Sequence, residues 1–292
     1  MFGRRIAFLG LGAMGFPMVN RLCDAGYTLQ TAPYLGDPRY DDEQKAAYLK
    51  KMGVEIKDSF GEAIDGADLI ISILPEDKEV LEVYTNSDFA ACVKRNTIIL
   101  EMTSCSPQTI HQLVHFYKDK NVCILDTPVS GGVIGAQNGK LTLFGSGDKT
   151  CFERIRPVME VLGEHIYWTG EAGSGKALKA VNQMLTAVHM LVLSEGFEMA
   201  KKLNINPEIM LDVISKSSGS SYVIERKFKN MLDNNYLAGF KLSHMRKDLR
   251  TALSSVNELN LPVSRLAYQL YEDAYQYDEF DYSAVCKAHQ DK

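Results

Sequence analysis

The feature that most constrains this 292-residue chain is a glycine-rich segment close to its start. A compact apolar run, RIAFL, leads into G-L-G-A-M-G, and a stretch with helical spacing follows. Glycines spaced in this way between a strand and a helix are typical of dinucleotide binding. The first permits a tight turn, the second lets backbone approach a pyrophosphate, and the third lets the helix pack closely on the strand. The helix N-terminus then offers N–H groups to the phosphates. The expected cofactor contacts in this segment are Gly10, Leu11, Gly12, Ala13, Met14 and Gly15.

The first half of the chain alternates short apolar runs with helical stretches. After the opening run, further runs lie at 27–32, 67–74, 97–101 and 122–125. Such alternation predicts βαβ units and a parallel sheet. The run ADLIISIL is apolar almost throughout, which is typical of a strand buried on both faces. We therefore expect an α/β Rossmann-type domain that covers residues 1–170.

The second half has a different pattern. From about Gly175 the apolar positions recur at helical spacing as far as about residue 203, and Gly196 alone interrupts them, so one long helix is predicted. Further helical stretches lie at 207–216, 222–233, 245–259 and 263–276, and no strand-like run follows Tyr167. We expect an all-α substrate and dimerisation domain at residues 171–292, entered through the long helix.

Composition narrows the classes of function. The net charge of −5 and the pI of about 5.7 argue against a nucleic-acid-binding or anionic-membrane-binding protein. No apolar run approaches the roughly 20 residues of a membrane helix, and the start lacks the apolar core of a signal peptide. Six cysteines without C-x-x-C spacing suit a reducing compartment, and the six histidines form no metal-ligand pattern. We expect a cytoplasmic protein that holds no metal.

Four blocks in order carry a resemblance to a known family. The chain resembles the 3-hydroxyacid (β-hydroxyacid) dehydrogenases, which include 3-hydroxyisobutyrate dehydrogenase, tartronate semialdehyde reductase and, more distantly, 6-phosphogluconate dehydrogenase. The resemblance runs over nearly the whole length. It implies a Rossmann-type domain, a helical domain, an active site in the cleft between them, and NAD or NADP as cofactor. The blocks are IAFLGLGAMGFPM at 6–18, DTPVSGG at 126–132 with GAQNGKLTL at 135–143, GSGKALKAVNQ at 173–183, and KDL at 247–249.

The resemblance assigns the catalytic lysine to Lys179 and its amide partner to Asn182. Lys179 lies three residues before Asn182 and four before Gln183, so the three share one face of the predicted helix. When hydride moves, a lysine side chain can donate a proton to the oxygen of the carbonyl that is reduced, or remove the proton from the hydroxyl that is oxidised. Lys176 is a nearby alternative, and on the residues alone either lysine fits a solvated helix face. The family register selects Lys179.

Two further blocks are expected to bind the substrate. Ser130, Gly131 and Gly132 can expose consecutive backbone N–H groups, and such a nest can hold a carboxylate. The family uses this block for the substrate acid, whereas a plain strand-ending turn is the alternative. The resemblance places Lys247 against substrate or nicotinamide, and Asp248 is expected to orient it by an ion pair. A solvated charge pair is the alternative there.

Other positions concern the cofactor. The resemblance places Leu74 and Pro75 along the cofactor and Ser104 near the nicotinamide ribose, although the local sequence is EMTSCSP where the family usually has SST. An acid after the second strand favours NAD and an arginine favours NADP. Asp37 would favour NAD and Arg39 would favour NADP, so the choice between the two cofactors stays open.

These observations predict an enzyme that interconverts a small 3-hydroxy acid and its semialdehyde with NAD(P), with Lys179 as general acid and base. One alternative is an imine reductase, a class built on the same plan that usually lacks the lysine. Another is a non-catalytic dinucleotide-binding module for protein interaction, which predicts loss of the lysine or of the SGG block. The expected partners are a small carboxylic acid and further copies of the chain. The family's long helices pack against a second subunit, so a homodimer or homotetramer is expected.

Overall fold

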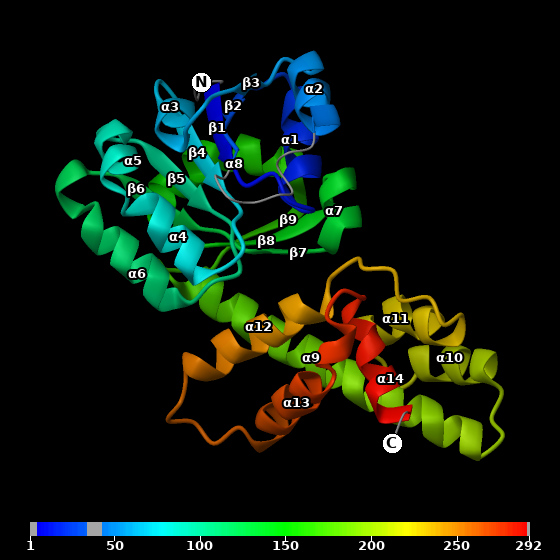
Figure 1. Cartoon of the computed structure of the whole chain (residues 1–292). Coiled ribbons are helices and arrows are strands. Elements are labelled where there is room, and N and C mark those ends of the chain that lie inside the picture. The colour runs from blue at the N-terminus through cyan, green and yellow to red at the C-terminus, as the bar shows by residue number, and fades with distance from the viewer. Residues whose placement is uncertain (1–4, 34–42, 291–292) are drawn as a thin grey trace. The chain divides into compact units, whose positions relative to one another are not determined.

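A computed structural model of the chain describes residues 5–33 and 43–290. It divides into two compact units, Met1–Lys179 and Ala180–Lys292 (Figure 1). The first unit contains the sheets and the second is built from helices. The division lies inside a helix, so the domain limits 1–170 and 171–292 stay a prediction.

A six-stranded parallel sheet forms the centre of the first unit. The predicted apolar runs become strands, and all neighbours in the sheet pair in parallel, which confirms the expected α/β fold. Only the two-residue strand β3 was not predicted, because it is too short to show a pattern. The strands in spatial order are β3 (Glu55–Ile56), β2 (Thr28–Thr31), β1 (Arg5–Leu9), β4 (Leu69–Ser72), β5 (Ile98–Glu101) and β6 (Cys123–Asp126).

Helices cover both faces of this sheet (Figure 1). One apolar core joins the sheet to α1 (Gly15–Asp24), α2 (Glu43–Lys51) and α8 (Lys149–Leu162). A second core joins the opposite face to the helices α3 (Phe60–Ile64), α4 (Asp77–Tyr84), α5 (Ser87–Cys92) and α6 (Pro107–Phe116). Burial on both faces explains why β4 and β5 are apolar at nearly every position.

A small second sheet follows β6 and was not predicted. It contains β7 (Val129–Ser130), β8 (Leu141–Gly145) and β9 (Gly163–Trp168), with α7 (Gly132–Asn138) between β7 and β8. β7 pairs antiparallel with β8, and β8 pairs parallel with β9.

The described part of the second unit is helical, as predicted. The long helix is α9 (Ser174–Lys202), which begins in the first unit and continues through the second. The hydrophobic core of the second unit contains residues such as Phe197, Phe228, Leu249 and Tyr271. The helix predicted at 245–259 occupies Leu242–Ser254 instead. No described helix is both long enough and apolar enough to cross a bilayer. The elements after α9 are α10 (Pro207–Ser215), α11 (Tyr222–Leu232), α12 (Leu242–Ser254), α13 (Pro262–Asp273), the short 3-10 turns Tyr275–Tyr277 and Tyr282–Ala284, and α14 (Val285–Gln290).

Candidate functional site

The glycine-rich loop joins β1 to α1, and its glycines occupy three different environments. Gly10 has a φ of +96°, and a Cβ there would overlap the carbonyl of Ile73. A Cβ on Gly15 would overlap the carbonyl of Gly10, so the start of α1 lies directly against the loop. A Cβ on Gly12 would meet nothing within 4 Å. The backbone at Gly12 is therefore open to a ligand, whereas Gly10 and Gly15 are required by the turn and the packing.

The start of α1 suits an anion. Its N-cap residue, Met14, makes no side-chain capping bond, and the first turn carries no acidic residue. The N-terminus of a helix presents backbone N–H groups that have no partner within the helix, and it carries the positive end of the helix dipole. Lys45 of α2 donates from Nζ to the carbonyl of Leu11 over 2.6 Å and lies 4.9 Å from the centre of the Phe16 ring. These features fit the phosphates of a dinucleotide.

Lys45 was missed by the sequence analysis, since nothing in a polar helix marks one lysine as the partner of a distant loop. Asp37 and Arg39, the two residues proposed to select the cofactor, lie outside the described residues. The strand that precedes them ends at Thr31, whose buried hydroxyl donates to the carbonyl of Phe8 over 2.7 Å. NAD and NADP both remain compatible with the described part of the chain.

The remaining predicted cofactor residues lie at the ends of neighbouring strands. Leu74 follows β4 and is buried, Pro75 is exposed, and Ser104 follows β5 and is half-buried. The Leu74 N–H donates to the hydroxyl of the buried Thr103 over 2.8 Å, which ties the two strand ends together. Because β1, β4 and β5 are adjacent and parallel, their loops share one edge of the sheet. The carboxyl edge of such a sheet is where ligands bind in open α/β folds.

Lys176, the alternative to Lys179, is an internal anchor. Its Nζ lies 2.5 Å from Glu101 Oε2 and also donates to the carbonyls of Glu101 and Thr103, over 3.0 and 2.5 Å. Both side chains of the ion pair are 0% exposed. Burial disfavours the charge on the lysine, but the neighbouring Cys105, Glu101 and Asp126 raise the pKa of Lys176 overall. A charged, fully bonded amine suits a structural role.

Asp126 fixes the start of α9. Its carboxylate accepts the N–H of Gly173 over 2.8 Å, the N–H of Lys176 over 3.0 Å and the hydroxyl of Ser146. Ser146 in turn accepts the N–H of Gly175 over 3.2 Å, and a Cβ on Gly175 would overlap the carbonyl of Phe144. Asp126 and Glu101, at the ends of β6 and β5, therefore hold the first turn of α9 against the sheet. The sequence analysis missed both, although Asp126 opens the DTPVSGG block.

Lys179 lies on α9 directly after this anchored turn. The residue is only 8% exposed. The spacing of three residues places Asn182 near Lys179 on the same helix face, as expected. The catalytic role of Lys179 stays a prediction.

Asn182 belongs to a chain of polar contacts in the second unit. Its amide donates to Gln183 over 3.0 Å, and the Gln183 amide donates to Asp248 Oδ2 over 2.7 Å. Asp248 Oδ1 lies 3.0 Å from Nζ of Lys247 in an ion pair that is largely buried. The expected pair between Lys247 and Asp248 is therefore present, and Gln183 holds its carboxylate. The structure brings Asn182 and Lys247 into one network.

The Ser130–Gly132 block forms the junction between β7 and α7. Ser130 pairs with Thr142 of β8, while Gly131 and Gly132 have φ values of +127° and +62°. Ser130 and Gly132 are half-buried and Gly131 is exposed, so the backbone of the block is accessible. Helix α7 packs on α1, which follows the glycine-rich loop. This geometry is compatible with carboxylate binding, which stays a prediction.

Comparison with known proteins gives the family. Residues 5–170 match the NAD-binding domain of 6-phosphogluconate dehydrogenase, and residues 173–288 match the model described as NAD-binding of NADP-dependent 3-hydroxyisobutyrate dehydrogenase. The chain belongs to the 3-hydroxyacid dehydrogenase family. The resemblance seen in the four sequence blocks is thereby confirmed, and the first unit carries an NAD-binding domain.

Named relatives of this dehydrogenase cover almost all of it. It is 33% identical to 2-(hydroxymethyl)glutarate dehydrogenase of Eubacterium barkeri, over 97% of this chain and 94% of that protein. It is 30% identical to 3-hydroxyisobutyrate dehydrogenase of Pseudomonas aeruginosa, over 98% and 99%. Among solved structures, 3-hydroxyisobutyrate dehydrogenase of Mycobacterium tuberculosis with L-serine has a TM-score of 0.89 at 29% identity and covers 99% of both chains. An imine reductase of Myxococcus stipitatus has a TM-score of 0.66 at 16% identity, covers 98% of this chain and 99% of its own, and shares the fold alone.

Proposed function

We propose that this member of the 3-hydroxyacid dehydrogenase family interconverts a small 3-hydroxy acid and its semialdehyde with NAD or NADP. The observation that carries the proposal is the position of Lys179, a largely buried lysine in α9 just after the helix start that Asp126 holds at the edge of the NAD-binding domain. The nearby Lys176 has a structural role in a buried ion pair with Glu101. Relatives support the substrate class. Their names include 3-hydroxyisobutyrate, 2-(hydroxymethyl)glutarate, L-serine and 2-hydroxy-3-oxopropionate, each with a carboxylate and an oxygen on the third carbon.

The proposed chemistry assigns one task to each group of residues. Phosphates of the cofactor bind at residues 10–15, at the open backbone of Gly12. A bound nicotinamide supplies or accepts the hydride. Lys179 exchanges the proton: its ammonium protonates the nascent alkoxide oxygen in reduction, and its neutral amine removes the hydroxyl proton in oxidation. Low exposure at Lys179 limits competition from water for that proton.

The remaining residues bind and orient. Backbone N–H groups of Ser130, Gly131 and Gly132 hold the substrate carboxylate. Asn182 supplies an amide to the substrate or to the lysine. Lys247, held by Asp248, adds a positive charge toward substrate or nicotinamide. In this proposal residues 1–170 bind the dinucleotide and, through Ser130–Gly132, the substrate carboxylate. Residues 171–292 supply the other substrate contacts and the subunit contacts.

We further propose a homodimer, or a homotetramer built from such dimers, in the cytoplasm. Four apolar side chains that are 48–65% exposed recur along α9: Val181, Leu185, Val192 and Met199. A helix face of this kind is typical of a subunit contact. Leu185→Glu should therefore lower the mass measured by light scattering. An unchanged mass would contradict a contact through this face.

The free thiols of all six cysteines suit a reducing compartment.

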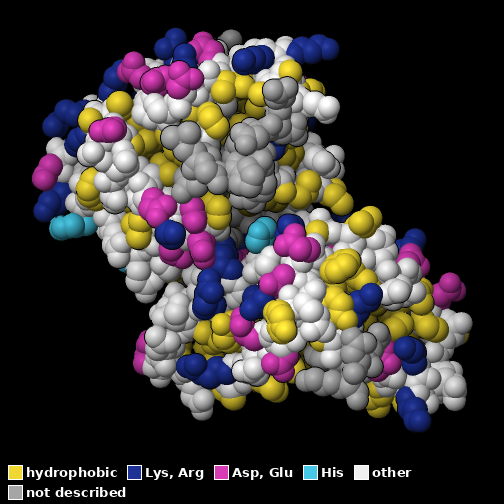
Figure 2. All heavy atoms as spheres, in the orientation of Figure 1, with side chains coloured by type: hydrophobic (Ala, Val, Ile, Leu, Met, Phe, Trp, Pro, Cys, Tyr) yellow, Lys and Arg dark blue, Asp and Glu magenta, His cyan; other side chains and the backbone are white. Residues whose placement is uncertain are grey.

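A small acid, rather than a nucleic acid, is the proposed partner. Figure 2 shows basic and acidic side chains interspersed on the viewed face, without a field of one sign. A nucleic-acid surface would gather its lysines and arginines on one face.

Absorbance of reduced nicotinamide tests the proposal. Wild-type protein is screened with NAD and with NADP against small 3-hydroxy acids, and with the reduced cofactors against semialdehydes and cyclic imines. Turnover of a 3-hydroxy acid or a semialdehyde is expected. Turnover of imines alone would favour an imine reductase, and cofactor binding without any turnover would favour a non-catalytic module.

A further inference from the structure

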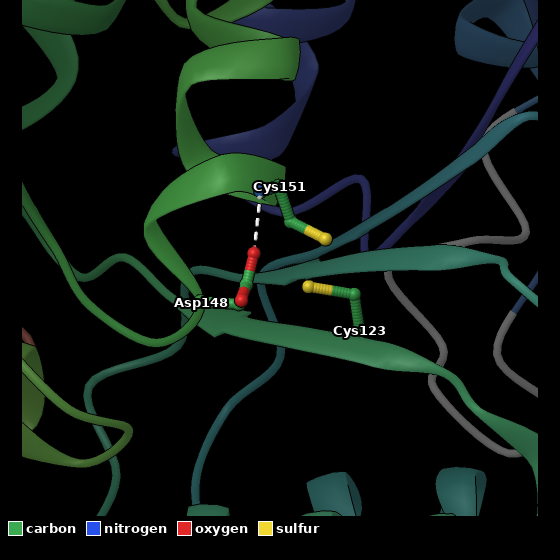
Figure 3. Close-up of side chains that lie close together, drawn as sticks. All are labelled: Cys123, Asp148 and Cys151. Atoms are coloured by element: carbon green, nitrogen blue, oxygen red, sulfur yellow. Dashed lines mark hydrogen bonds between the residues drawn. The ribbon is translucent and has the colours of Figure 1, made fainter.

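Three potential metal ligands lie together where β6 begins and α8 begins (Figure 3). Cys123 is the first residue of β6, Asp148 is the N-cap of α8, and Cys151 lies in the first turn of that helix. One sulfur or carboxylate oxygen from each lies within 4.8 Å of the other two. Figure 3 shows the two sulfurs turned toward one another, with the carboxylate beside them. Asp148 also accepts the Cys151 N–H over 2.7 Å, which fixes the carboxylate at this end of the helix.

This cluster is separate from the candidate active site. Cys123 starts β6, whereas Asp126 ends it and anchors α9. A strand rises about 3.3 Å per residue, so the two ends of β6 are about 10 Å apart. The sequence shows no C-x-x-C pair here, because the fold brings the two cysteines together from distant parts of the chain. A ligand at this cluster would therefore bind apart from the residues proposed for the dehydrogenase reaction.

We propose that Cys123, Cys151 and Asp148 bind a thiophilic divalent cation of the Zn²⁺ type, with water as the fourth ligand. Two sulfurs and one carboxylate oxygen are a donor set that Zn²⁺ accepts, and three protein ligands plus water complete a tetrahedron. With Zn–S bonds of about 2.3 Å, a tetrahedral ion needs its sulfurs about 3.8 Å apart. The two sulfurs, which lie within 4.8 Å of one another, therefore need to close by no more than about 1 Å, which side-chain rotation can supply.

The surroundings compensate the negative charge of such a site. Two thiolates and a carboxylate exceed the charge of the cation by one. Arg154 acts on both thiols in the direction that favours thiolate. The positive end of the α8 dipole acts in the same direction on Asp148 and Cys151.

The environment makes the two thiols slow to react as a disulfide pair, and a cation that binds here has to displace their protons. Burial is the largest cause that raises the pKa of both Cys123 and Cys151 above the ordinary thiol value. Thiol–disulfide exchange requires thiolate, so two protonated thiols react slowly. A bound cation stabilises the thiolates directly and displaces their protons.

Cobalt titration of the full-length, chelator-treated protein tests the site. Co²⁺ should bind at one ion per chain and give a sulfur-to-cobalt charge-transfer band, and Zn²⁺ should remove the band. The Cys123→Ser/Cys151→Ser variant should lose the band. Asp148→Asn keeps a capping oxygen and should keep the band at an affinity at least about tenfold weaker. Cys92→Ser, a half-buried cysteine of α5, is the matched control and should behave as wild type.

A second measurement uses wild-type protein only, so it does not depend on the folding of a variant. Zn²⁺ should slow maleimide labelling of Cys123 and Cys151, mapped by peptide mass, and leave Cys92 unchanged. Trp168 gives a parallel signal, because its indole N–H donates to the carbonyl of Gly147, the residue before Asp148, over 3.1 Å. Absence of both the band and the protection would overturn the proposal, as would a band that persists in the double variant. A Cys123–Cys151 disulfide that forms in air even when Zn²⁺ is present would also overturn the proposal and would indicate a redox pair.

Discussion

Removing the amine of Lys176 should destabilise the first unit strongly. The Lys176→Met variant keeps the length of the side chain but leaves the Glu101 carboxylate without its cation, 2.5 Å away and fully buried. It also leaves the carbonyls of Glu101 and Thr103 without this donor. Breaking a buried ion pair from one side costs about 3–5 kcal/mol, against a typical total stability of about 5–15 kcal/mol.

Urea unfolding followed by tryptophan fluorescence measures this loss. Trp168 is the only tryptophan in the chain and lies in the first unit, so its signal reports the part that contains the pair. With a slope of about 2 kcal/mol per molar urea, the midpoint should fall by about 1.5–2.5 M. Lys94→Met is the control in the same unit. It breaks a pair with Asp65 at 2.9 Å whose side chains are 61% and 72% exposed, so its midpoint should stay within error of wild type.

A double variant separates the pair from the packing around it. Glu101→Leu with Lys176→Met leaves no unpaired buried charge, so it should regain most of the lost stability. A Lys176→Met midpoint equal to that of wild type would refute the reasoning. A double variant less stable than the single one would refute the view that the uncompensated charge causes the loss.

Three further perturbations address other parts of the account. Gly15→Ala should abolish cofactor binding and lower the melting temperature, because the new Cβ would overlap the Gly10 carbonyl; retained NAD(P) binding by calorimetry would contradict the close packing. Lys45→Ala should weaken binding of NAD and NADP by about threefold to tenfold, by loss of a charge beside the loop, with the effect shrinking in high salt. Glu272→Gln should lower stability at pH 7 and have little effect at low pH. Arg246 hydrogen-bonds to Glu272 and lowers its pKa below the ordinary 4.5, so the stabilisation exists above that pH and is lost as pH falls through the folded pKa. Melting curves from pH 3 to pH 7 that differ equally at every pH would contradict this.

Much of the fold could be predicted from short-range patterns. Strands buried on both faces are continuous apolar runs, so β1, β4 and β5 were recognisable. The glycine-rich loop was recognisable because Gly10 and Gly15 are required by close backbone contacts, while Gly12 leaves the backbone open to a ligand. The second sheet was not, since β7 has two residues and β9, GEHIYW, is mostly exposed and shows no continuous apolar run.

The site could be predicted only in part. Lys179 and Asn182 came from a family register, because a lysine on a helix carries no sign of its role. The network that distinguishes Lys176 from Lys179 joins Glu101 and Asp126 to α9 across 75 and 50 residues of sequence. Contacts of that range leave no periodic trace. They arise only when parallel strands bring their ends to one edge.

The most direct test of the central claim compares Lys179→Ala with wild type in the nicotinamide absorbance assay, on whichever substrate turns over. We predict that the variant unfolds at the wild-type midpoint and binds cofactor normally, while kcat falls by about 10²–10⁴-fold, the usual contribution of a general acid–base group. A kcat within a few-fold of wild type would contradict the assignment of Lys179 as the proton-exchanging residue.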